Sequence, residues 1–138
     1  MTATIPPCPP GRAMLEGKTV LITAAAGTGI GFATARRCVE EGATVMISDI
    51  HERRLVEAVA RLAAIAPTRP TSRLCNVTRE AEVQALVDAA VAEMGRIDVL
   101  VNNAGITRDA TLHHMSPEQW WAVINTNLGS MFNMSRNV

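Results

Sequence analysis

Short apolar runs alternate with helical patterns of apolar residues from Lys18 onward. Four runs have the length of strands, and they cover residues 19–23, 43–48, 72–76 and 97–101. Apolar residues spaced by three and four predict the intervening helices, at about residues 30–41, 55–66 and 78–94. Strand–helix alternation at this period predicts an α/β fold: a three-layer Rossmann-type parallel sheet with helices on both faces.

Residue types at the ends of these elements support the assignment. Gly42, Pro67 and Gly95 are placed to end the three helices, and Thr78 is placed to cap the third. The third helix is expected to bury Val83, Leu86, Val87, Ala90, Val91 and Met94. A capping box with proline at the first helical position begins a last helix at Ser116. That helix puts one set of residues on one side: Trp121, Ile124, Leu128, Met131 and Ser135.

Composition limits the classes of protein to consider. The 138 residues are 48% hydrophobic, which is enough for the core of one domain at most. Basic and acidic residues balance at 13 each, so neither nucleic acid nor a membrane surface is an expected partner. Cys8, Cys38 and Cys75 lie far apart, so we predict no metal site and read them as reduced thiols of a cytoplasmic protein.

The chain divides into two parts. Residues 1–14 contain four prolines between positions 6 and 10 and are predicted to form a Pro-rich flexible tail. Residues 15–138 are predicted to form a partial Rossmann domain, truncated after the fourth strand and the helix that follows it.

A glycine-rich turn joins the first strand to the first helix, and it reads Thr23-Ala-Ala-Ala-Gly27-Thr-Gly29-Ile-Gly31. Glycines let a backbone approach a phosphate, and a helix N-terminus offers free N–H groups at a positive dipole end. The alternative is a purely structural tight turn. The position of the glycine-rich sequence after a strand and before a helix favours a binding site for the pyrophosphate of a nicotinamide dinucleotide.

Two polar residues follow the next strands. Asp49 ends the second strand, where a carboxylate can accept both hydroxyls of an adenine ribose and would repel a 2′-phosphate. This favours NAD, although a surface acid is the alternative, and Arg53 and Arg54 leave NADP open. Asn76 can hydrogen-bond the adenine amino group, and an ordinary turn-forming asparagine is equally compatible with the sequence.

Val101-Asn-Asn-Ala-Gly105 directly follows the fourth strand. Together with the Thr23–Gly31 turn it resembles the short-chain dehydrogenase/reductase family over roughly residues 15–138. The stretch 101–109, followed by Asn125-Thr-Asn127-Leu128, looks most like the 3-oxoacyl-ACP reductase and acetoacetyl-CoA reductase branch. The resemblance implies the strand order 3-2-1-4 and dimerisation through the last helix.

The resemblance also implies roles for individual residues. Asn127 would be the catalytic asparagine that holds a water in the proton relay, although an asparagine within a helix often has only a structural role. The expected cofactor-binding residues are Thr23, Gly27, Gly29, Ile30, Gly31, Asp49, Asn76, Val77, Asn103, Ala104 and Gly105. Two features depart from the family pattern, since Ala24 replaces a usual glycine and the turn is one residue longer.

Hydride transfer in this family needs a tyrosine, a lysine four positions on and a serine that polarises the carbonyl. The sequence has no tyrosine, and Lys18 is its only lysine. We therefore expect this chain to bind a cofactor and to be inactive alone, as the N-terminal part of an oxidoreductase acting on a carbonyl or secondary alcohol, such as an oxoacyl thioester. The alternative is a non-catalytic dinucleotide-binding or interaction module.

Overall fold

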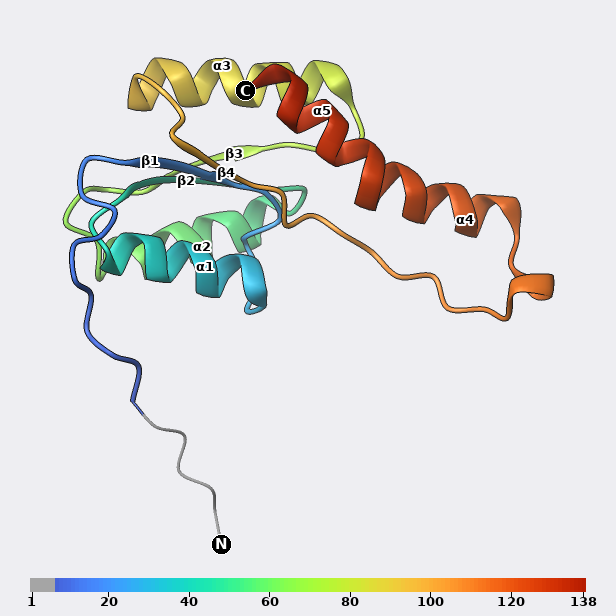
Figure 1. The fold of residues 1–138 in the computed structure, drawn as a ribbon, viewed down its shortest axis with the longest axis horizontal. Helices are drawn as coiled ribbons and strands as arrows, with labels where there is room; N and C mark the ends of the chain where they lie inside the picture. The colour runs from blue at the N-terminus through green and yellow to red at the C-terminus, as the bar shows by residue number, and fades with distance from the viewer. Residues whose placement is uncertain (1–6) are drawn as a thin grey trace, which may run out of the picture.

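The computed structural model describes residues 7–138, so part of the predicted tail lies outside the described residues. Four parallel strands form one sheet in the order β3-β2-β1-β4 (Figure 1). The strands are β1 (Thr19–Ile22), β2 (Thr44–Asp49), β3 (Thr71–Leu74) and β4 (Val99–Val101). The predicted fold class and strand order are both confirmed.

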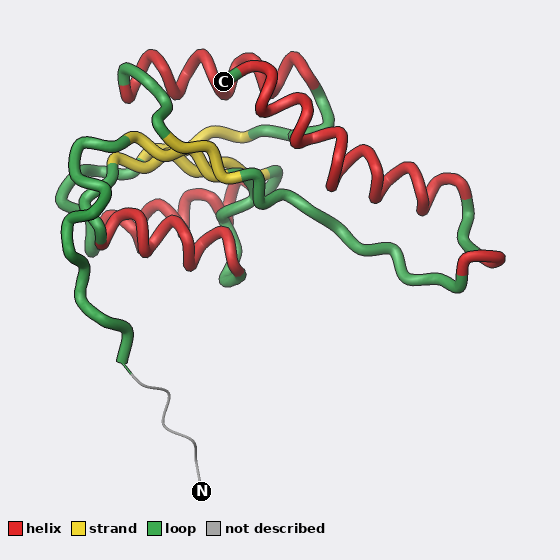
Figure 2. Tube along the Cα trace, in the orientation of Figure 1, coloured by secondary structure: helices red, strands yellow, loops and turns green. Residues whose placement is uncertain are grey.

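Helices cover both faces of this sheet. One face carries α1 (Ile30–Glu40) and α2 (Glu52–Ala63), and the other carries α3 (Glu80–Met94) with α5 (Ser130–Asn137) packed against it (Figure 1). A long segment after β4 leads to the short 3₁₀ helix η1 (Leu112–His114) and then to α4 (Pro117–Ile124) (Figure 2). The helix α4 extends beyond the carboxyl ends of the strands (Figure 1).

The core has one cluster on each face of the sheet. Val20 and Ile22 of β1 pack toward α1 and α2, while Leu21 packs toward α3 and α5. All three side chains are fully buried, as predicted for a continuous apolar run. Met134 is the residue of α5 that enters the second cluster.

Two predictions about α3 are wrong. Arg79, not Thr78, is the N-cap residue, because the Thr78 hydroxyl donates instead to Asn76 Oδ1 at 2.8 Å. Val91 is exposed rather than buried, because α3 contacts the sheet and α5 along a narrow stripe. The predicted positions Val83, Leu86, Val87 and Ala90 are buried, and Gly95 ends the helix with a φ of 83°.

The last helix is interrupted by a π-helical segment, η2 (Asn125–Gly129), between α4 and α5. The predicted capping box is present, since Ser116 Oγ accepts from Gln119 N and Gln119 Oε1 accepts from Ser116 N. The buried positions of α5 are Ser130 and Met134, whereas the apolar side predicted from spacing is largely exposed. A π segment carries an extra residue per turn, so helical spacing across it does not follow one face.

The segment before β1 is attached to the end of α1. Glu41 is buried, and its carboxylate accepts from the N–H groups of Arg12 at 2.8 Å and Met14 at 3.1 Å. These two N–H groups lower the pKa of Glu41, and the neighbouring Arg37 lowers it further. Within residues 7–138, no helix is long and apolar enough to cross a membrane.

Candidate cofactor-binding site

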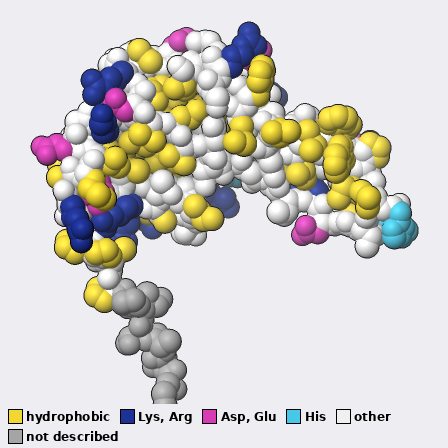
Figure 3. Space-filling view, viewed as in Figure 1, with side chains coloured by type: hydrophobic (Ala, Val, Ile, Leu, Met, Phe, Trp, Pro, Cys, Tyr) yellow, Lys and Arg dark blue, Asp and Glu magenta, His cyan; other side chains and the backbone are white. Residues whose placement is uncertain are grey.

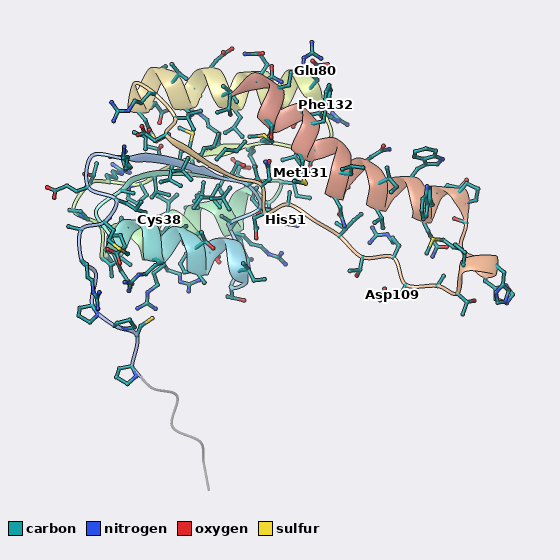
Figure 4. The ribbon with its side chains drawn as sticks, viewed as in Figure 1. Cys38, His51, Glu80, Asp109, Met131 and Phe132 are labelled. Atoms are coloured by element: carbon teal, nitrogen blue, oxygen red, sulfur yellow. The ribbon has the colours of Figure 1, made fainter. Side chains whose placement is uncertain are left out.

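A cavity of about 380 Å³ opens at the carboxyl ends of the strands. It brings together five of the predicted cofactor-binding residues, which are Asp49, Asn76, Val77, Ala104 and Gly105. It is also lined by Ala24, Ile50, His51, Cys75, Thr78, Ile106 and Thr126. The side chain of His51 lies at this end of the sheet, from which the segment carrying Asp109 leads away (Figure 4).

Thr23 and Asn103 are predicted site residues that hold the glycine-rich turn to β4 instead of lining the cavity. The Thr23 hydroxyl accepts from the N–H groups of Asn103 at 3.0 Å and Ala104 at 3.1 Å. Asn103 Nδ2 donates to the carbonyl oxygens of Thr23 at 2.9 Å and Ala24 at 3.0 Å. Direct contact of either residue with a cofactor stays a prediction.

The alanine that replaces the usual glycine takes a glycine-like conformation. Ala24 has a φ of 52°, in the left-handed region that is unfavourable for residues with a Cβ atom. Its carbonyl oxygen is the acceptor that Asn103 binds. The left-handed conformation of Ala24 is therefore held by hydrogen bonding, at some cost in backbone strain.

Gly29 and Gly31 differ in their surroundings. A Cβ atom at Gly31 would lie 2.4 Å from Asn103 Nδ2 and 2.9 Å from the Ala24 oxygen, so only glycine fits between the turn and α1. A Cβ atom at Gly29 would meet nothing within 4 Å, so the space beside Gly29 is open. Gly29 is the N-cap of α1 without a side-chain cap, and Ile30 begins the helix. The first N–H groups of α1 can therefore bind an anion.

Asp49 lies at the end of β2 with each carboxylate oxygen held by one backbone N–H group. Ala26 N donates to Oδ2 at 3.1 Å, and His51 N donates to Oδ1 at 3.2 Å. The carboxylate is partly exposed and lines the cavity. Each oxygen keeps a further lone pair, which a sugar hydroxyl can use.

Asn76 is fixed by its neighbours on the loop after β3. Its Oδ1 accepts from Thr78 N at 3.1 Å and from Thr78 Oγ1 at 2.8 Å, and its N–H donates to Glu82 at 2.7 Å. With both lone pairs of Oδ1 in use, the amide nitrogen is the group that this arrangement offers to a ligand. An asparagine followed two residues later by threonine is the sequence signal for this turn.

Sequence reasoning missed Cys75 as a cavity residue. Burial raises the pKa of its thiol to about 11, and Glu82 adds to the effect. The thiol is therefore protonated at neutral pH and offers the cavity a small, weakly polar surface. In the sequence, the one signal at Cys75 is its place near the end of a predicted strand, and that place indicates a packing role.

Asn127 lies in the π segment η2, and both ends of its side-chain amide are paired with Ile106. Oδ1 accepts from Ile106 N at 2.8 Å, and Nδ2 donates to Ile106 O at 3.0 Å. Gly105 lies beside it, since a Cβ atom there would be 3.5 Å from Asn127 Oδ1. The amide thus fastens the segment after β4 to the last helix, and its predicted catalytic role stays a prediction.

A second cavity, of about 390 Å³, lies on the outer side of the turn. It is lined by Ala26, Gly27 and Thr28 of the turn and by Arg54 and Arg61 of α2, among others. Arg53 is not among the residues that line this cavity, and it pairs with Glu57 at 3.3 Å. Of the two arginines named as potential phosphate ligands, Arg54 is therefore the one beside the turn.

Other candidate groups do not converge on a site. His113 and His114 lie in the exposed helix η1, with ring centroids 4.1 Å apart. Among residues 7–138, no three His, Cys, Asp or Glu side chains are arranged to hold a metal ion. Trp120 and Trp121 are both about half exposed, in the apolar area that covers the α4 end of the molecule (Figure 3).

The sheet, its strand order and the glycine-rich turn between β1 and α1 define a Rossmann-type α/β domain. The family model for short chain dehydrogenase matches residues 18–138. The chain therefore belongs to the short-chain dehydrogenase family, whose members are oxidoreductases that use NAD(H) or NADP(H).

Named relatives agree with this assignment. The chain is 50% identical over 126 residues to (5R,7aS)-5-hydroxy-7a-methyl-1-oxo-2,3,5,6,7,7a-hexahydro-1H-indene-carboxyl-CoA reductase of Mycobacterium tuberculosis, covering 91% of this chain and 48% of the relative. It is 47% identical to a 3-oxoacyl-acyl-carrier-protein reductase of Thermotoga maritima, covering 90% of this chain and 50% of that reductase. The chain thus spans about half the length of these curated relatives.

Solved structures show the same fold. A short chain dehydrogenase from Mycobacterium smegmatis aligns with a TM-score of 0.94 and 46% identity, covering 97% of this chain and 56% of that protein. Actinorhodin polyketide ketoreductase with NADPH aligns with a TM-score of 0.83 and 33% identity, covering 87% of this chain and 45% of that protein.

Proposed function

We propose that residues 15–138 bind the adenosine and pyrophosphate portions of NAD(H) as part of a short-chain dehydrogenase. The observation that carries this proposal is the position of Asp49. Its carboxylate shares one cavity with Asn76 and Val77, and its Oδ2 atom is hydrogen-bonded to the glycine-rich turn. A ribose diol on Asp49 would put the adjoining phosphates near Gly29 and the N-terminus of α1.

A titration of this chain with NADH, followed by the nicotinamide fluorescence, tests the proposal. We expect saturable binding of NADH, and ADP-ribose, which lacks the nicotinamide, should displace it. Reduced nicotinamide mononucleotide is the matched control, because it lacks the adenosine half and should not bind measurably. No binding of NADH at millimolar concentration would contradict the proposal.

NADP(H) is the alternative cofactor, and Arg54 is the observation that favours it. Arg54 lines the cavity beside the turn residues Gly27 and Thr28, where a guanidinium would attract a 2′-phosphate. Asp49 opposes this, because a carboxylate next to a 2′-phosphate is repelled directly. If Arg54 binds a 2′-phosphate, Arg54→Ala should weaken the binding of NADPH and leave the binding of NADH unchanged. If NAD(H) is the cofactor, as we propose, the substitution should change neither affinity by more than about twofold.

For the whole protein, we propose hydride transfer between NAD(H) and a carbonyl or secondary alcohol. The names of the relatives, an indene-carboxyl-CoA reductase and 3-oxoacyl-acyl-carrier-protein reductases, favour a 3-oxoacyl or 3-hydroxyacyl thioester as the substrate class. The tyrosine and lysine that the family uses are missing from these 138 residues, where Lys18 is the only lysine. We expect no turnover from this chain, and turnover of an oxoacyl thioester once a segment with those residues is supplied.

We also propose self-association through the last helix. Leu128 and Phe132 are about two-thirds exposed, and Trp121 and Met131 are about half exposed, along one continuous stretch of helix. An apolar surface of this kind is typical of an interface. Light scattering should give at least a dimer for this chain, and Leu128→Lys with Phe132→Ser should shift it toward a monomer.

A further inference from the structure

The carboxylate of Asp49 is in contact with the glycine-rich turn as well as with the cavity. Ala26 N–H donates to Oδ2 at 3.1 Å, and the preceding N–H, of Ala25, donates to the carbonyl oxygen of Ser48 at 3.1 Å. Two consecutive N–H groups of the turn are therefore bound to the end of β2. We propose that Asp49 is a positioning residue for the pyrophosphate turn in addition to a ligand for the ribose, an inference that rests on the proposed function.

The turn is anchored on two sides and open in the middle. On the β4 side, Asn103 Nδ2 binds the carbonyl oxygens of Thr23 and Ala24. On the β2 side, Asp49 provides the side-chain contact, to Ala26. Between Ala26 and α1, a Cβ atom at Gly27 would be 3.8 Å from its nearest neighbour, and one at Gly29 would have none within 4 Å. The position of the phosphate-facing part of the turn therefore depends on these two anchors.

The path of the turn brings Ala26 to Asp49. Ala25 and Ala26 are buried, whereas Gly29 lies at the surface. The turn first passes over the end of β2 and only then returns to α1. A carboxylate oxygen has more than one lone pair, so Asp49 can hold Ala26 N–H and a ribose hydroxyl at the same time.

Charge repulsion and anchoring of the turn predict opposite changes in phosphate affinity when the Asp49 side chain is removed. A carboxylate near a pyrophosphate repels it, so removing the charge of Asp49 should strengthen phosphate binding if charge were the dominant effect. If Asp49 positions the turn, removing its side chain should weaken phosphate binding even for a ligand that has no ribose hydroxyls. ADP and 2′,3′-dideoxyadenosine 5′-diphosphate form the ligand pair that separates these effects.

The experiment is a calorimetric or NADH-competition titration of both diphosphates on the 138-residue chain. Asp49→Ala should weaken binding of the dideoxy compound roughly fivefold. It should weaken binding of ADP about ten times more than that, because ADP also loses its ribose contact. Asp49→Asn removes the same charge but keeps an acceptor for Ala26 N–H, so the dideoxy compound should bind within about twofold of wild type. Glu52→Gln removes a nearby exposed charge of α2 and should leave dideoxy binding unchanged or slightly tighter.

Amide hydrogen exchange gives a second measurement that needs no ligand. The Ala26 amide should be protected in the wild type and in Asp49→Asn, and should lose at least tenfold protection in Asp49→Ala, while the amides of β1 stay protected. Equal protection of Ala26 in all three proteins would overturn the proposal.

The outcomes separate this inference from the proposed function. If the wild type binds neither NADH nor ADP, the proposed function fails and the inference fails with it. If the wild type binds both, but Asp49→Ala weakens ADP and leaves the dideoxy compound unchanged or tighter, Asp49 acts only through the ribose. The inference then fails while the proposed function stands.

Discussion

The β1–β2 half of the molecule and the α4–α5 end differ in how far their side chains are buried and hydrogen-bonded. Around β1 and β2, apolar residues are fully buried. The side chains of Asp49 and Asn103 bind the backbone of the turn, and the Thr23 hydroxyl accepts from the backbone N–H group of Asn103. Along α4, η2 and α5, large apolar side chains are exposed, and they include Trp121, Leu128 and Phe132. Apolar atoms gather at the α4 end of the molecule in Figure 3. The first region buries its apolar side chains and pairs its polar ones, whereas the second leaves large apolar side chains exposed.

The largest expected difference between the two regions is in stability. Leu21→Ala removes a fully buried side chain between β1 and α3 and should lower the free energy of unfolding by about 3 kcal/mol. Leu128→Ala is the same chemical change at a position 63% exposed and should change it by less than about 0.5 kcal/mol. Urea unfolding at low protein concentration measures both. Similar losses at both positions would contradict the comparison.

The next largest effect is expected within the turn. Gly31→Ala places a Cβ atom 2.4 Å from Asn103 Nδ2, so the anchor on Thr23 and Ala24 must move. It should lower the free energy of unfolding by about 2 kcal/mol and weaken NADH at least tenfold. Gly29→Ala meets nothing within 4 Å and is the matched control: thermal stability should be unchanged while NADH binding falls. A destabilised Gly29→Ala would contradict this geometry.

A smaller, stabilising effect is expected at Ala24. Its φ of 52° is strained for alanine, so Ala24→Gly should raise the free energy of unfolding by about 0.5–1 kcal/mol. Ala25→Gly is the control, because Ala25 is fully buried and not in this conformation, and it should destabilise. Thermal melts of the two variants compare them directly. A loss of stability in Ala24→Gly would show that the residue is unstrained.

The smallest effect is expected from acid. The N–H group of Thr19 and the guanidinium of Arg96 lower the pKa of Asp98, as Arg12 and Met14 do for Glu41. A lowered folded-state pKa stabilises the protein above the ordinary carboxyl pKa of about 4, and the stabilisation is lost as pH falls through the folded value. Asp98→Asn should therefore have a lower melting temperature than the wild type at pH 7. The two melting temperatures should converge as the pH falls toward 3. A difference in melting temperature that stays constant from pH 7 to pH 3 would contradict the lowered pKa of Asp98.

How much the sequence predicted differs between the same two regions. Near β1 and β2, continuous apolar runs and a glycine-rich turn are local signals, so the strands and the residues Asp49 and Asn76 of the cavity were predicted. The order of the strands was predicted from the family resemblance. The left-handed Ala24 and the anchoring role of Asp49 were not, because both depend on contacts made after folding. At the other end, the π segment changes the helical phase after Asn125, so spacing identified an apolar side but not its exposure.

Asp49 is the residue proposed to bind the adenine ribose and to set the preference for NAD(H). Paired titrations of this chain with NADH and NADPH, for the wild type and for Asp49→Ser, test it most directly. The wild type should bind NADH at least tenfold more tightly than NADPH, and Asp49→Ser should reduce that ratio to near one by weakening NADH binding more than NADPH binding. Equal binding of both cofactors by the wild type, or a ratio unchanged in Asp49→Ser, would contradict it.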